Sequence, residues 1–390
     1  MSIRKMWRIG IREAKMILHD PRAFMFFLVV PFIVTFLFGF LFINHMVIGI
    51  RVAVVDQANT QVSRYISRSF DESMRFDVEY YLESEAEAVK MIEQDKVDVI
   101  LLIPKDFTYN LNRGKNTNVL IGINAVNSII NNTSIAGAME IIQNCSVRLS
   151  AAGLIAKGAT VDMAKNKIMP ITGVMRPWFN SQYSYLNYFF LGVVAIALQQ
   201  LMILAAATSF AKEKEQKTLP ELVSCASNSV LAGLGKLLFY WVIALIIMVS
   251  VYYITFKVYA IPMRGKPGDI IALGIPFIIA SLGIGMCIGL LCKNQINAMH
   301  WTMLLTYPCY LISGYAWPHS LMPDFLVKLS QVVPITHIAE HTRDIALLGH
   351  GFSYIKQDLL ILSAMAVAAT VIGLLLFVWQ SKKKGGEATC

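Results

Sequence analysis

Long apolar runs divide the chain into one isolated segment near the N-terminus and five closely spaced segments in its second half. Each run is close to the ~20 residues that a helix needs to cross a bilayer. The runs are Ala23–Ile43, Leu186–Phe210, Leu237–Phe256, Ile270–Cys292, Met299–Ala316 and Leu359–Trp379. The pattern predicts a mainly α membrane protein, in which a bundle of six transmembrane helices carries one inserted domain between its first two helices.

The segment before the first run, residues 1–22, has the pattern of an amphipathic helix. Apolar side chains such as Met6 and Trp7 recur at helical spacing, and basic side chains such as Arg8 and Arg12 occupy the other face. A helix of this kind lies in the membrane interface with its apolar face toward the lipid. A plain basic flank of the first span is the alternative interpretation.

The inserted stretch, residues 44–185, alternates strand-like and helix-like patterns and predicts an α/β domain with a helical arm. Ser84 and Glu87 have the spacing of a capping box at the start of a helix. After Asn127 the pattern is helical as far as about Lys167. The expected strands are Arg51–Asp56, Phe76–Leu82, Val97–Pro104 and Asn118–Asn124, and the expected helices are Gln61–Phe70 and Ser84–Lys96.

Composition and charge agree with a membrane protein and suggest its orientation. The 390 residues are 56% hydrophobic and 15% charged, with a mean hydropathy of +0.56, which is too apolar for a soluble domain. Most of the +9 net charge lies in residues 1–22, 211–236 and 380–390, which share one side if six helices alternate. Loops rich in Lys and Arg stay cytoplasmic, so we expect both termini inside and the α/β domain outside.

Three basic residues depart from this rule. Lys257, Arg264 and Lys266 lie in a segment that the alternation places outside. The basic balance as a whole indicates topology and contact with anionic lipid headgroups, and no nucleic-acid partner is expected.

Two polar segments are too patterned to be simple loops. Residues 211–236 are charged and then amphipathic, which suggests a helix that docks against something in the cytoplasm. Residues 317–358 combine prolines with two amphipathic stretches, which suggests a re-entrant helical hairpin at the outer surface. Backbone of this kind is tolerated at membrane depth only where other protein covers it.

Candidate chemistry is sparse. His337, Glu340 and His341 spell H-x-x-E-H, the spacing of one class of zinc peptidase, but no third ligand or catalytic domain accompanies them. The chain has no Walker A loop, so it is not expected to hydrolyse ATP. Gln199 and Gln200 lie mid-span and are candidates for a translocation path or for interhelical hydrogen bonds.

Small residues in the fourth run suggest close helix packing. They are Ser281, Gly283, Gly285 and Gly289. Pro31 is expected to kink the first span.

The order of these parts, together with several motifs, resembles the permease subunits of the ATP-binding-cassette type 2 transporters, in the branch with a large extracytoplasmic domain after the first helix. The resemblance covers essentially the whole chain. The matching pieces are HDPRAF (His19–Phe24), VAVVD (Val52–Asp56), FDESMRFDV (Phe70–Val78), EAEAVKMIEQDKVDVILLIPKDF (Glu85–Phe107), KEKEQKTLPELV (Lys212–Val223) with Gly235-Lys236, GYAWPHSLMP (Gly314–Pro323) and PITHIAEHTRDIALLGHG (Pro334–Gly351).

The resemblance implies a coupling element that plugs into a separate ATPase subunit. Its residues in this chain are Glu213, Glu215, Thr218, Leu219, Glu221 and Leu222. Family members often have Gly immediately before the Thr-Leu pair, where this chain has Lys217. The resemblance also places Pro334, Thr336, His337, Glu340 and Arg343 in the outer hairpin, which lowers the odds of a peptidase.

The resemblance further implies a homo- or heterodimer of six-helix subunits above two ATPases, which bind the ATP and Mg, with no cofactor or metal on this chain. The expected function is export of amphipathic or hydrophobic, drug- or lipid-like compounds from the inner membrane, with a periplasmic adaptor as a further expected partner. A non-transport membrane sensor or scaffold that displays the external domain is the competing class.

Overall fold

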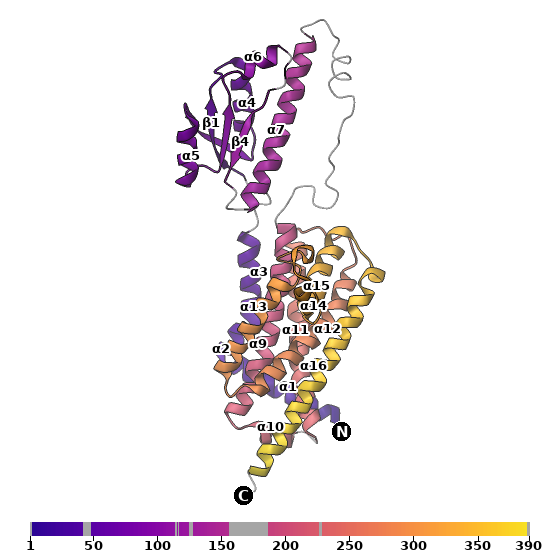
Figure 1. Cartoon of the computed structure of the whole chain (residues 1–390). Helices are drawn as coiled ribbons and strands as arrows, with labels where there is room; N and C mark the ends of the chain where they lie inside the picture. The colour runs from indigo at the N-terminus through magenta and orange to yellow at the C-terminus, as the bar shows by residue number, and fades with distance from the viewer. Residues whose placement is uncertain are drawn as a thin grey trace. The chain divides into compact units, whose positions relative to one another are not determined.

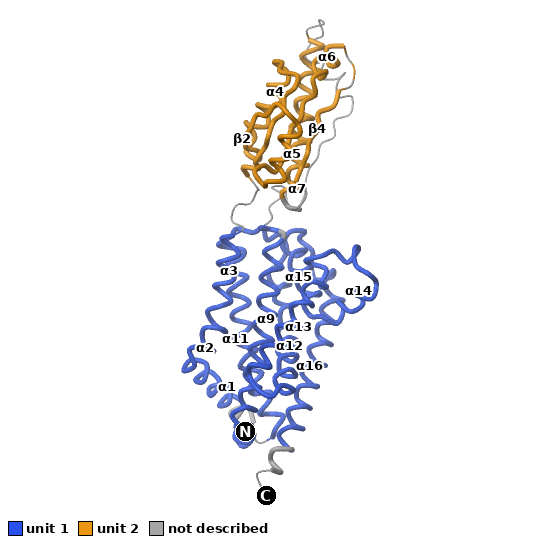
Figure 2. Tube along the Cα trace, turned by 60° about the vertical axis from the view of Figure 1, so that its left-hand side comes forward, with its two compact units in different colours: residues 1–45, 178–390 blue, residues 46–177 orange. Residues whose placement is uncertain are grey.

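The computed structural model describes residues 2–41, 48–113, 115, 117–124, 128–155, 186–225 and 228–387. The chain folds into two compact units, as Figure 2 shows. Unit 1 combines residues 1–45 with 178–390, and unit 2 is the continuous segment 46–177 between them. The predicted arm beyond Ile155 falls on residues outside the described ranges.

Unit 2 is a three-layer α/β fold around a four-stranded sheet in the order β2-β1-β3-β4. The first three strands are parallel, and β4 is antiparallel to β3. The strands are β1 (Ile50–Asp56), β2 (Phe76–Leu82), β3 (Val99–Ile103) and β4 (Leu120–Ile123), and the helices are α4 (Gln61–Asp71), α5 (Glu85–Glu93), α6 (Phe107–Asn112) and α7 (Ser128–Ile155). All four predicted strands are present, and α6 was not predicted.

Alternation along the central strands explains why helices cover both faces of this sheet. Val52 and Val54 of β1 pack toward α4 and α7, whereas Val55 packs toward α5. The capping box predicted at Ser84 is wrong, because the Ser84 side chain makes no capping hydrogen bond. The described capping box is at Thr60, where Thr60 and Ser63 cap the start of α4 reciprocally.

All regular secondary structure among the described residues of unit 1 is helical. Its elements are α1 (Ser2–His19), α2 (Pro21–Phe24), the π-turn η1 (Met25–Val29), α3 (Val30–Leu41), the π-turn η2 (Leu186–Phe190), α9 (Leu191–Glu215), α10 (Leu219–Cys225), α11 (Ser229–Lys257), α12 (Pro267–Leu291), α13 (Gln295–Ile312), η3 (His319–Leu321), α14 (Asp324–Ser330), α15 (Pro334–Arg343), the π-turn η4 (Asp344–Leu348) and α16 (Phe352–Glu387).

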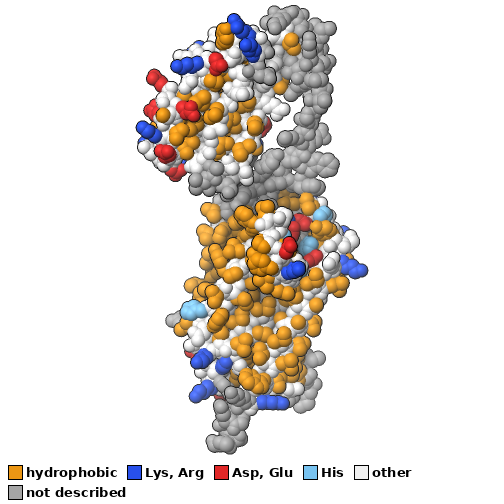
Figure 3. Space-filling model, in the orientation of Figure 1, with side chains coloured by type: hydrophobic (Ala, Val, Ile, Leu, Met, Phe, Trp, Pro, Cys, Tyr) orange, Lys and Arg blue, Asp and Glu red, His pale blue; other side chains and the backbone are white. Residues whose placement is uncertain are grey.

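Four of these helices are long and apolar enough to cross a membrane: Leu191–Glu215, Ser229–Lys257, Pro267–Leu291 and Phe352–Lys382. Met25–Leu41 is a shorter apolar helix. It is irregular at η1, as expected beside Pro31, which cannot donate a hydrogen bond to the turn before it. Apolar side chains cover most of the face of unit 1 seen in Figure 3.

Helices α9 and α12 form the centre of unit 1, and small residues let them approach closely, which confirms the packing role predicted for the glycines. A Cβ added at Gly285 or Gly289 would lie within 2.4 Å of a backbone oxygen of α9. A Cβ at Gly283 would lie 2.9 Å from Ala369 of α16. Glycine is therefore required at these three crossings.

The two ends of unit 1 carry different parts of the chain. The start of α1 and the end of α16 lie at the same end as α10, whereas α14 and α15 lie at the other end (Figure 1). We call these the α10 end and the α15 end. The end of α3, after which unit 2 is inserted, is also at the α15 end (Figures 1 and 2).

Candidate functional site

The junction between α9 and α10 is a sharp, well-bonded helix end. The Thr218 amide donates to the Glu213 carbonyl at 3.0 Å, and the Lys217 amide donates to the Lys214 carbonyl at 3.3 Å. These two bonds form a Schellman motif, whose C′ residue adopts the left-handed conformation. Lys217 occupies that position with φ of 58°. The structure thus explains why glycine suits this position and why lysine is strained there.

Helix α10 packs one side into unit 1 and exposes the other. Leu219 and Leu222 are fully buried in the main core. Glu221 is exposed, as is Glu215 at the end of α9. Thr218 starts α10, because its carbonyl accepts from the Leu222 amide at 3.0 Å. The predicted coupling residues therefore separate into an inward set that positions α10 and an outward set open to a partner.

A buried ion network lies directly behind this junction. Lys236 Nζ of α11 is 2.9 Å from Glu213 Oε1 of α9 and 3.1 Å from Glu13 Oε1 of α1. All three side chains are at most 2% exposed. Arg12 Nη1 lies 3.3 Å from the same Glu213 oxygen. We call Arg12, Glu13, Glu213 and Lys236 the basal cluster, which joins three helices far apart in sequence.

Neighbouring polar groups add hydrogen bonds to the two carboxylates of the basal cluster. Ser209 and Tyr240 each donate to Glu13 Oε2 at 3.4 Å. Thr218 donates to Glu213 Oε2, so the first residue of the α10 turn is bonded to the cluster. Two cations face two carboxylates, so the cluster is electrically balanced. Removing one member would leave a buried charge without compensation.

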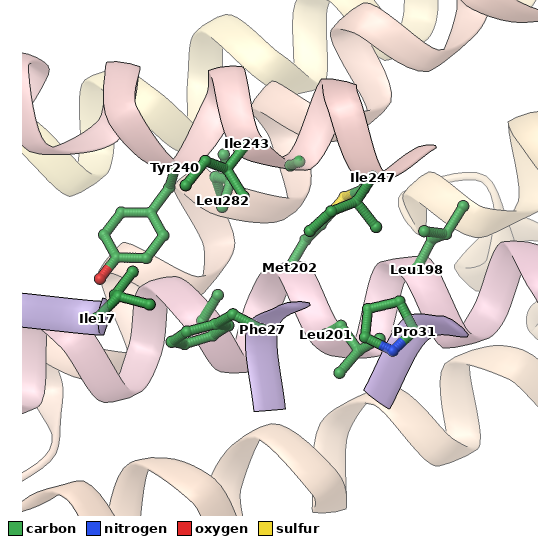
Figure 4. A pocket seen from close by; sticks show the side chains of 12 residues that line it. Ile17, Phe27, Pro31, Leu198, Leu201, Met202, Tyr240, Ile243, Ile247 and Leu282 are labelled. Carbon is green, nitrogen blue, oxygen red and sulfur yellow. The ribbon is translucent and has the colours of Figure 1, made fainter. Parts of the chain in front are cut away.

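Apolar side chains seal the cluster from the middle of the bundle. Tyr240 also lines a small cavity of about 30 Å³ together with residues such as Ile17, Phe27 and Met202. Figure 4 shows this cavity between segments that include α9, α11 and the end of α1. Its lining is almost wholly apolar, so an apolar layer lies next to the basal cluster on the side of the bundle interior.

Two further contacts fasten the end of α9 to other helices. Lys214 Nζ donates to the carbonyls of Leu290 and Cys292 at 2.6 and 2.8 Å, where α12 ends. Glu215 accepts from the Gln295 amide at 3.0 Å, where α13 begins. The end of α9 is therefore bonded to the ends of the helices around it, which makes this region a single mechanical block.

The two glutamines proposed for a path have different surroundings. Gln200 accepts a hydrogen bond from Thr306 of α13. Gln199 is 2% exposed, and its Oε1 has no hydrogen-bond partner within the described residues. Gln199 lines a mostly apolar cavity of about 340 Å³ between α9, α12, α13 and the segment around Pro334. Gln200 thus makes the interhelical hydrogen bond, whereas Gln199 lines the cavity and its carbonyl oxygen accepts no described hydrogen bond.

At the α15 end, two histidines share one carboxylate. His337 Nδ1 is 2.6 Å from Asp358 Oδ1, and His341 Nε2 is 2.8 Å from Asp358 Oδ2. His337 Nε2 also donates to the Gln331 carbonyl at 2.9 Å. We call His337, His341 and Asp358 the histidine cluster. It fastens α15 to the start of α16.

This geometry differs from that of a zinc peptidase. A metal needs free ring nitrogens directed at one point, whereas His337 and His341 direct nitrogens at Asp358. Glu340 lies 3.4 Å from Arg343. Among the described residues, no group of three or more His, Cys, Asp or Glu is placed to hold a metal ion. Pro334 and Thr336 are buried at the start of α15.

Sequence reasoning missed half of the basal cluster. Glu213 belonged to the predicted coupling set, and Lys236 was noted only as part of a Gly-Lys pair. Arg12 was assigned to the polar face of the first helix, and Glu13 was not singled out. A signal for Glu13 existed, because it lies four residues from both Ile9 and Ile17, which are buried on the same helix face.

Comparison with known proteins agrees with this architecture. Residues 22–375 match the family described as ABC-2 family transporter protein. The chain is 23% identical over 345 residues to the "Probable multidrug ABC transporter permease YbhR" of Escherichia coli, covering 88% of this chain and 90% of that protein. It is 21% identical to YbhS of the same organism, described in the same words, over 94% and 95% of the two chains. It is 22% identical to the "Linearmycin resistance permease protein LnrN" of Bacillus subtilis, over 83% and 86%.

The family match spans nine-tenths of the chain and includes α9, α10 and α15. The relatives are aligned over most of both chains, so the likeness is not confined to one unit. The long apolar helices of unit 1 fit the membrane permeases that these relatives are named as. This chain belongs to the ABC-2 family of transporter proteins.

Proposed function

We propose that the chain is the membrane-spanning permease subunit of an ABC exporter that moves amphipathic or hydrophobic, drug- or lipid-like compounds outward. A separate ATPase subunit binds ATP and Mg and supplies the energy. The names of the relatives, two multidrug permeases and one permease for linearmycin resistance, support this substrate class.

The proposed topology has six spans with both termini in the cytoplasm of a cell whose inner membrane holds the protein. The helices α3 and α13 supply the two spans beyond the four long apolar helices. The α10 end is then cytoplasmic and the α15 end is external, which puts unit 2 outside, as the excess of Lys and Arg in residues 1–22 and 211–236 suggests. Unit 2 offers a surface for a periplasmic adaptor.

The observation that carries the coupling proposal is the double attachment of Glu213. It bonds to Thr218 at the start of α10 and to Lys236 and Arg12 on two other helices. A push on the exposed side of the α9–α10 junction, at Glu215 of α9 and Glu221 of α10, therefore reaches α1, α9 and α11 together. Closure of two ATPases needs such a rigid lever to move one helix bundle against another.

The proposed path lies beside α9, between two permease subunits in a homo- or heterodimer. Gln199 lines an apolar cavity of about 340 Å³, within the size range of small-molecule sites, and its buried carbonyl oxygen has no hydrogen-bond partner among the described residues. One polar group in an apolar cavity suits an amphipathic compound, since it orients the compound without binding it tightly.

The first experiment tests the coupling site by charge reversal. The double variant Glu215→Lys/Glu221→Lys changes exposed positions and is expected to abolish co-purification of the ATPase subunit that the wild-type chain captures from its native membrane. The control is Asp324→Lys, which reverses an exposed carboxylate at the opposite, α15 end of unit 1. Retention of the ATPase by the double variant would refute the coupling assignment.

A sensor or scaffold gives a different outcome in the same experiment. It predicts that no Walker-containing protein co-purifies with the wild-type chain and that no such protein is encoded by a neighbouring gene. Either finding with wild-type protein would contradict the exporter proposal as a whole, independently of the variants.

A further inference from the structure

A large apolar cavity of unit 1 lies at the α15 end and shares no lining residue with the cavity proposed for the path. It measures about 430 Å³ and is formed by the last three turns of α11, the segment 258–266 and the first turn of α12. Its lining is apolar apart from the hydroxyls of Tyr252 and Tyr253 and the ammonium of Lys257. This volume is within the range of about 300–1,000 Å³ typical of small-molecule sites.

The cavity opens toward the lipid rather than into the bundle. Tyr253 is 65% exposed, and Val249 and Ile271 on the two helices are also exposed, although all three line the cavity. They belong to helices long and apolar enough to span the bilayer. A cavity of this kind on the lipid-facing surface is filled by an acyl chain of a bilayer lipid.

The segment 258–266, which we call the roof of the cavity, is bonded to other parts of unit 1. The amides of Arg264 and Gly265 donate to the carbonyls of Ala346 and Ile345 at 2.8 and 3.0 Å. The Tyr259 hydroxyl donates to the Phe36 carbonyl at 3.2 Å, and Ile261 is 2% exposed. The cavity is therefore preformed, and a ligand would not have to order it.

The charges at the roof provide the selectivity. Lys257 lines the cavity, and Arg264 and Lys266 are exposed on the roof segment, next to the lining residues Met263 and Pro267. Lys257 and Lys266 form no ion pair with the described residues.

The only carboxylate between residues 257 and 269 is Asp269, which is buried. These three cations also give residues 257–269 a net charge of +2, against the rule that favours Lys and Arg on the α10 side. A lysine at the end of α11 would favourably meet the helix dipole, but this does not account for Lys266 or for the cavity.

We propose that this site binds one anionic phospholipid of the surrounding bilayer, with an acyl chain in the cavity and the phosphate at Lys257 and Lys266. Since lipid tails are as apolar as the cavity walls, the chain gains little by moving from bilayer to protein. The headgroup charge must therefore decide which lipid is retained. The site requires unit 1 to span the bilayer but does not depend on the ATPase or on the exported compound.

The test measures which lipid stays bound to the chain. Wild-type protein is reconstituted in vesicles of equal phosphatidylglycerol and phosphatidylcholine, extracted in detergent and examined by native mass spectrometry. We expect one tightly held phosphatidylglycerol per chain. Since each cation near an anionic headgroup changes binding about fivefold, two should give a preference of about 25-fold over phosphatidylcholine.

Matched variants assign that preference to the site. Lys257→Gln/Lys266→Gln should abolish it, whereas Lys328→Gln/Lys356→Gln, which removes two exposed lysines from the same end of unit 1, should leave it. Ile271→Trp fills the mouth of the cavity and should reduce retention of both lipids. Unchanged thermal midpoints in detergent would show that these variants fold.

Three results would overturn the proposal. The first is equal retention of the two lipids by wild-type protein. The second is an equal loss of the preference for phosphatidylglycerol in Lys257→Gln/Lys266→Gln and in Lys328→Gln/Lys356→Gln. The third is unchanged lipid retention by Ile271→Trp. Displacement of phosphatidylglycerol by excess inorganic phosphate would also overturn it, since the site would then bind a soluble anion. None of these results involves the ATPase, so failure here is distinct from failure of the proposed function.

Discussion

The two ends of unit 1 are each fastened by a buried polar cluster, but the clusters are built differently. The basal cluster sets two basic side chains, Arg12 and Lys236, against two carboxylates and joins three helices. The histidine cluster places one carboxylate, Asp358, between two imidazoles. The α10 end is thus held by two acidic and two basic side chains, and the α15 end by one shared carboxylate.

The range of each cluster along the chain also differs. Glu13 and Lys236 are 223 positions apart by their numbers, whereas all members of the histidine cluster fall within one short segment of sequence. The basal cluster therefore joins α1, α9 and α11, which are distant in sequence, whereas the histidine cluster fastens α15 to the start of α16. Under the proposed function, the α10 end transmits force from the ATPase, and the α15 end gives local support.

Removing the central cation of the basal cluster should have the largest effect. Lys236→Met leaves Glu13 and Glu213 buried near each other with only Arg12 beside them. Loss of one partner of a buried ion pair costs about 3–5 kcal/mol of folding free energy. We expect a large fall in the thermal unfolding midpoint in detergent, measured on purified protein.

A compensated variant tests whether charge, rather than packing, causes that loss. Lys236→Met combined with Glu13→Gln and Glu213→Gln removes the uncompensated carboxylates and should recover most of the stability. Transport driven by the ATPase should stay impaired, because the link between three helices is absent. A compensated variant no more stable than Lys236→Met would show that the loss arises from packing.

At the α15 end, Asp358→Asn should have the next largest effect. The amide replaces two charge-assisted bonds from His337 and His341 with weaker neutral bonds, which costs about 2 kcal/mol. Asp324→Asn, at an exposed carboxylate of the same end, is the control and should be neutral. The comparison fails if Asp358→Asn impairs ATPase-coupled transport as severely as Lys236→Met does.

Local patterns were readable from the sequence, as particular elements show. The limits of β2 and the occurrence of every described strand follow from apolar runs and alternation, and the small residues of α12 were recognised as packing positions. The H-x-x-E-H spelling located two members of the histidine cluster, although their shared partner Asp358 was not found. The assignment of the H-x-x-E-H motif to an outer hairpin came from the family resemblance.

Long-range pairing was not readable from one sequence. Nothing in the neighbourhood of Lys236 indicates that its partners lie on α1 and α9. Likewise, the coupling set was named without a way to tell Glu213, which is buried, from Glu221, which is exposed. Burial depends on how helices distant in sequence pack together. The capping box at Ser84 failed because spacing alone does not place a side chain on a backbone amide.

A smaller gain is expected from relieving strain at the α9–α10 junction. Lys217→Gly permits the left-handed conformation without a Cβ clash and should stabilise the fold by about 1 kcal/mol. Lys217→Ala is the control, since it removes the same charge but keeps the Cβ. Equal stabilisation by glycine and alanine would mean that charge, and not backbone conformation, limits this turn at the α10 end.

The smallest effect on stability is expected between the two ends of unit 1. There Gln200 makes an interhelical hydrogen bond, whereas the neighbouring Gln199 lines a cavity. Gln200→Met removes the hydrogen bond with Thr306, and bonds of this kind in membrane proteins average about 0.6 kcal/mol. Gln199→Met removes a buried carbonyl without a described partner, so it should not lower the thermal midpoint. It should instead alter the concentration of an exported dye that half-saturates transport. If Gln199→Met destabilises the protein and leaves that concentration unchanged, Gln199 is a packing residue, and the cavity beside α9 is not the path.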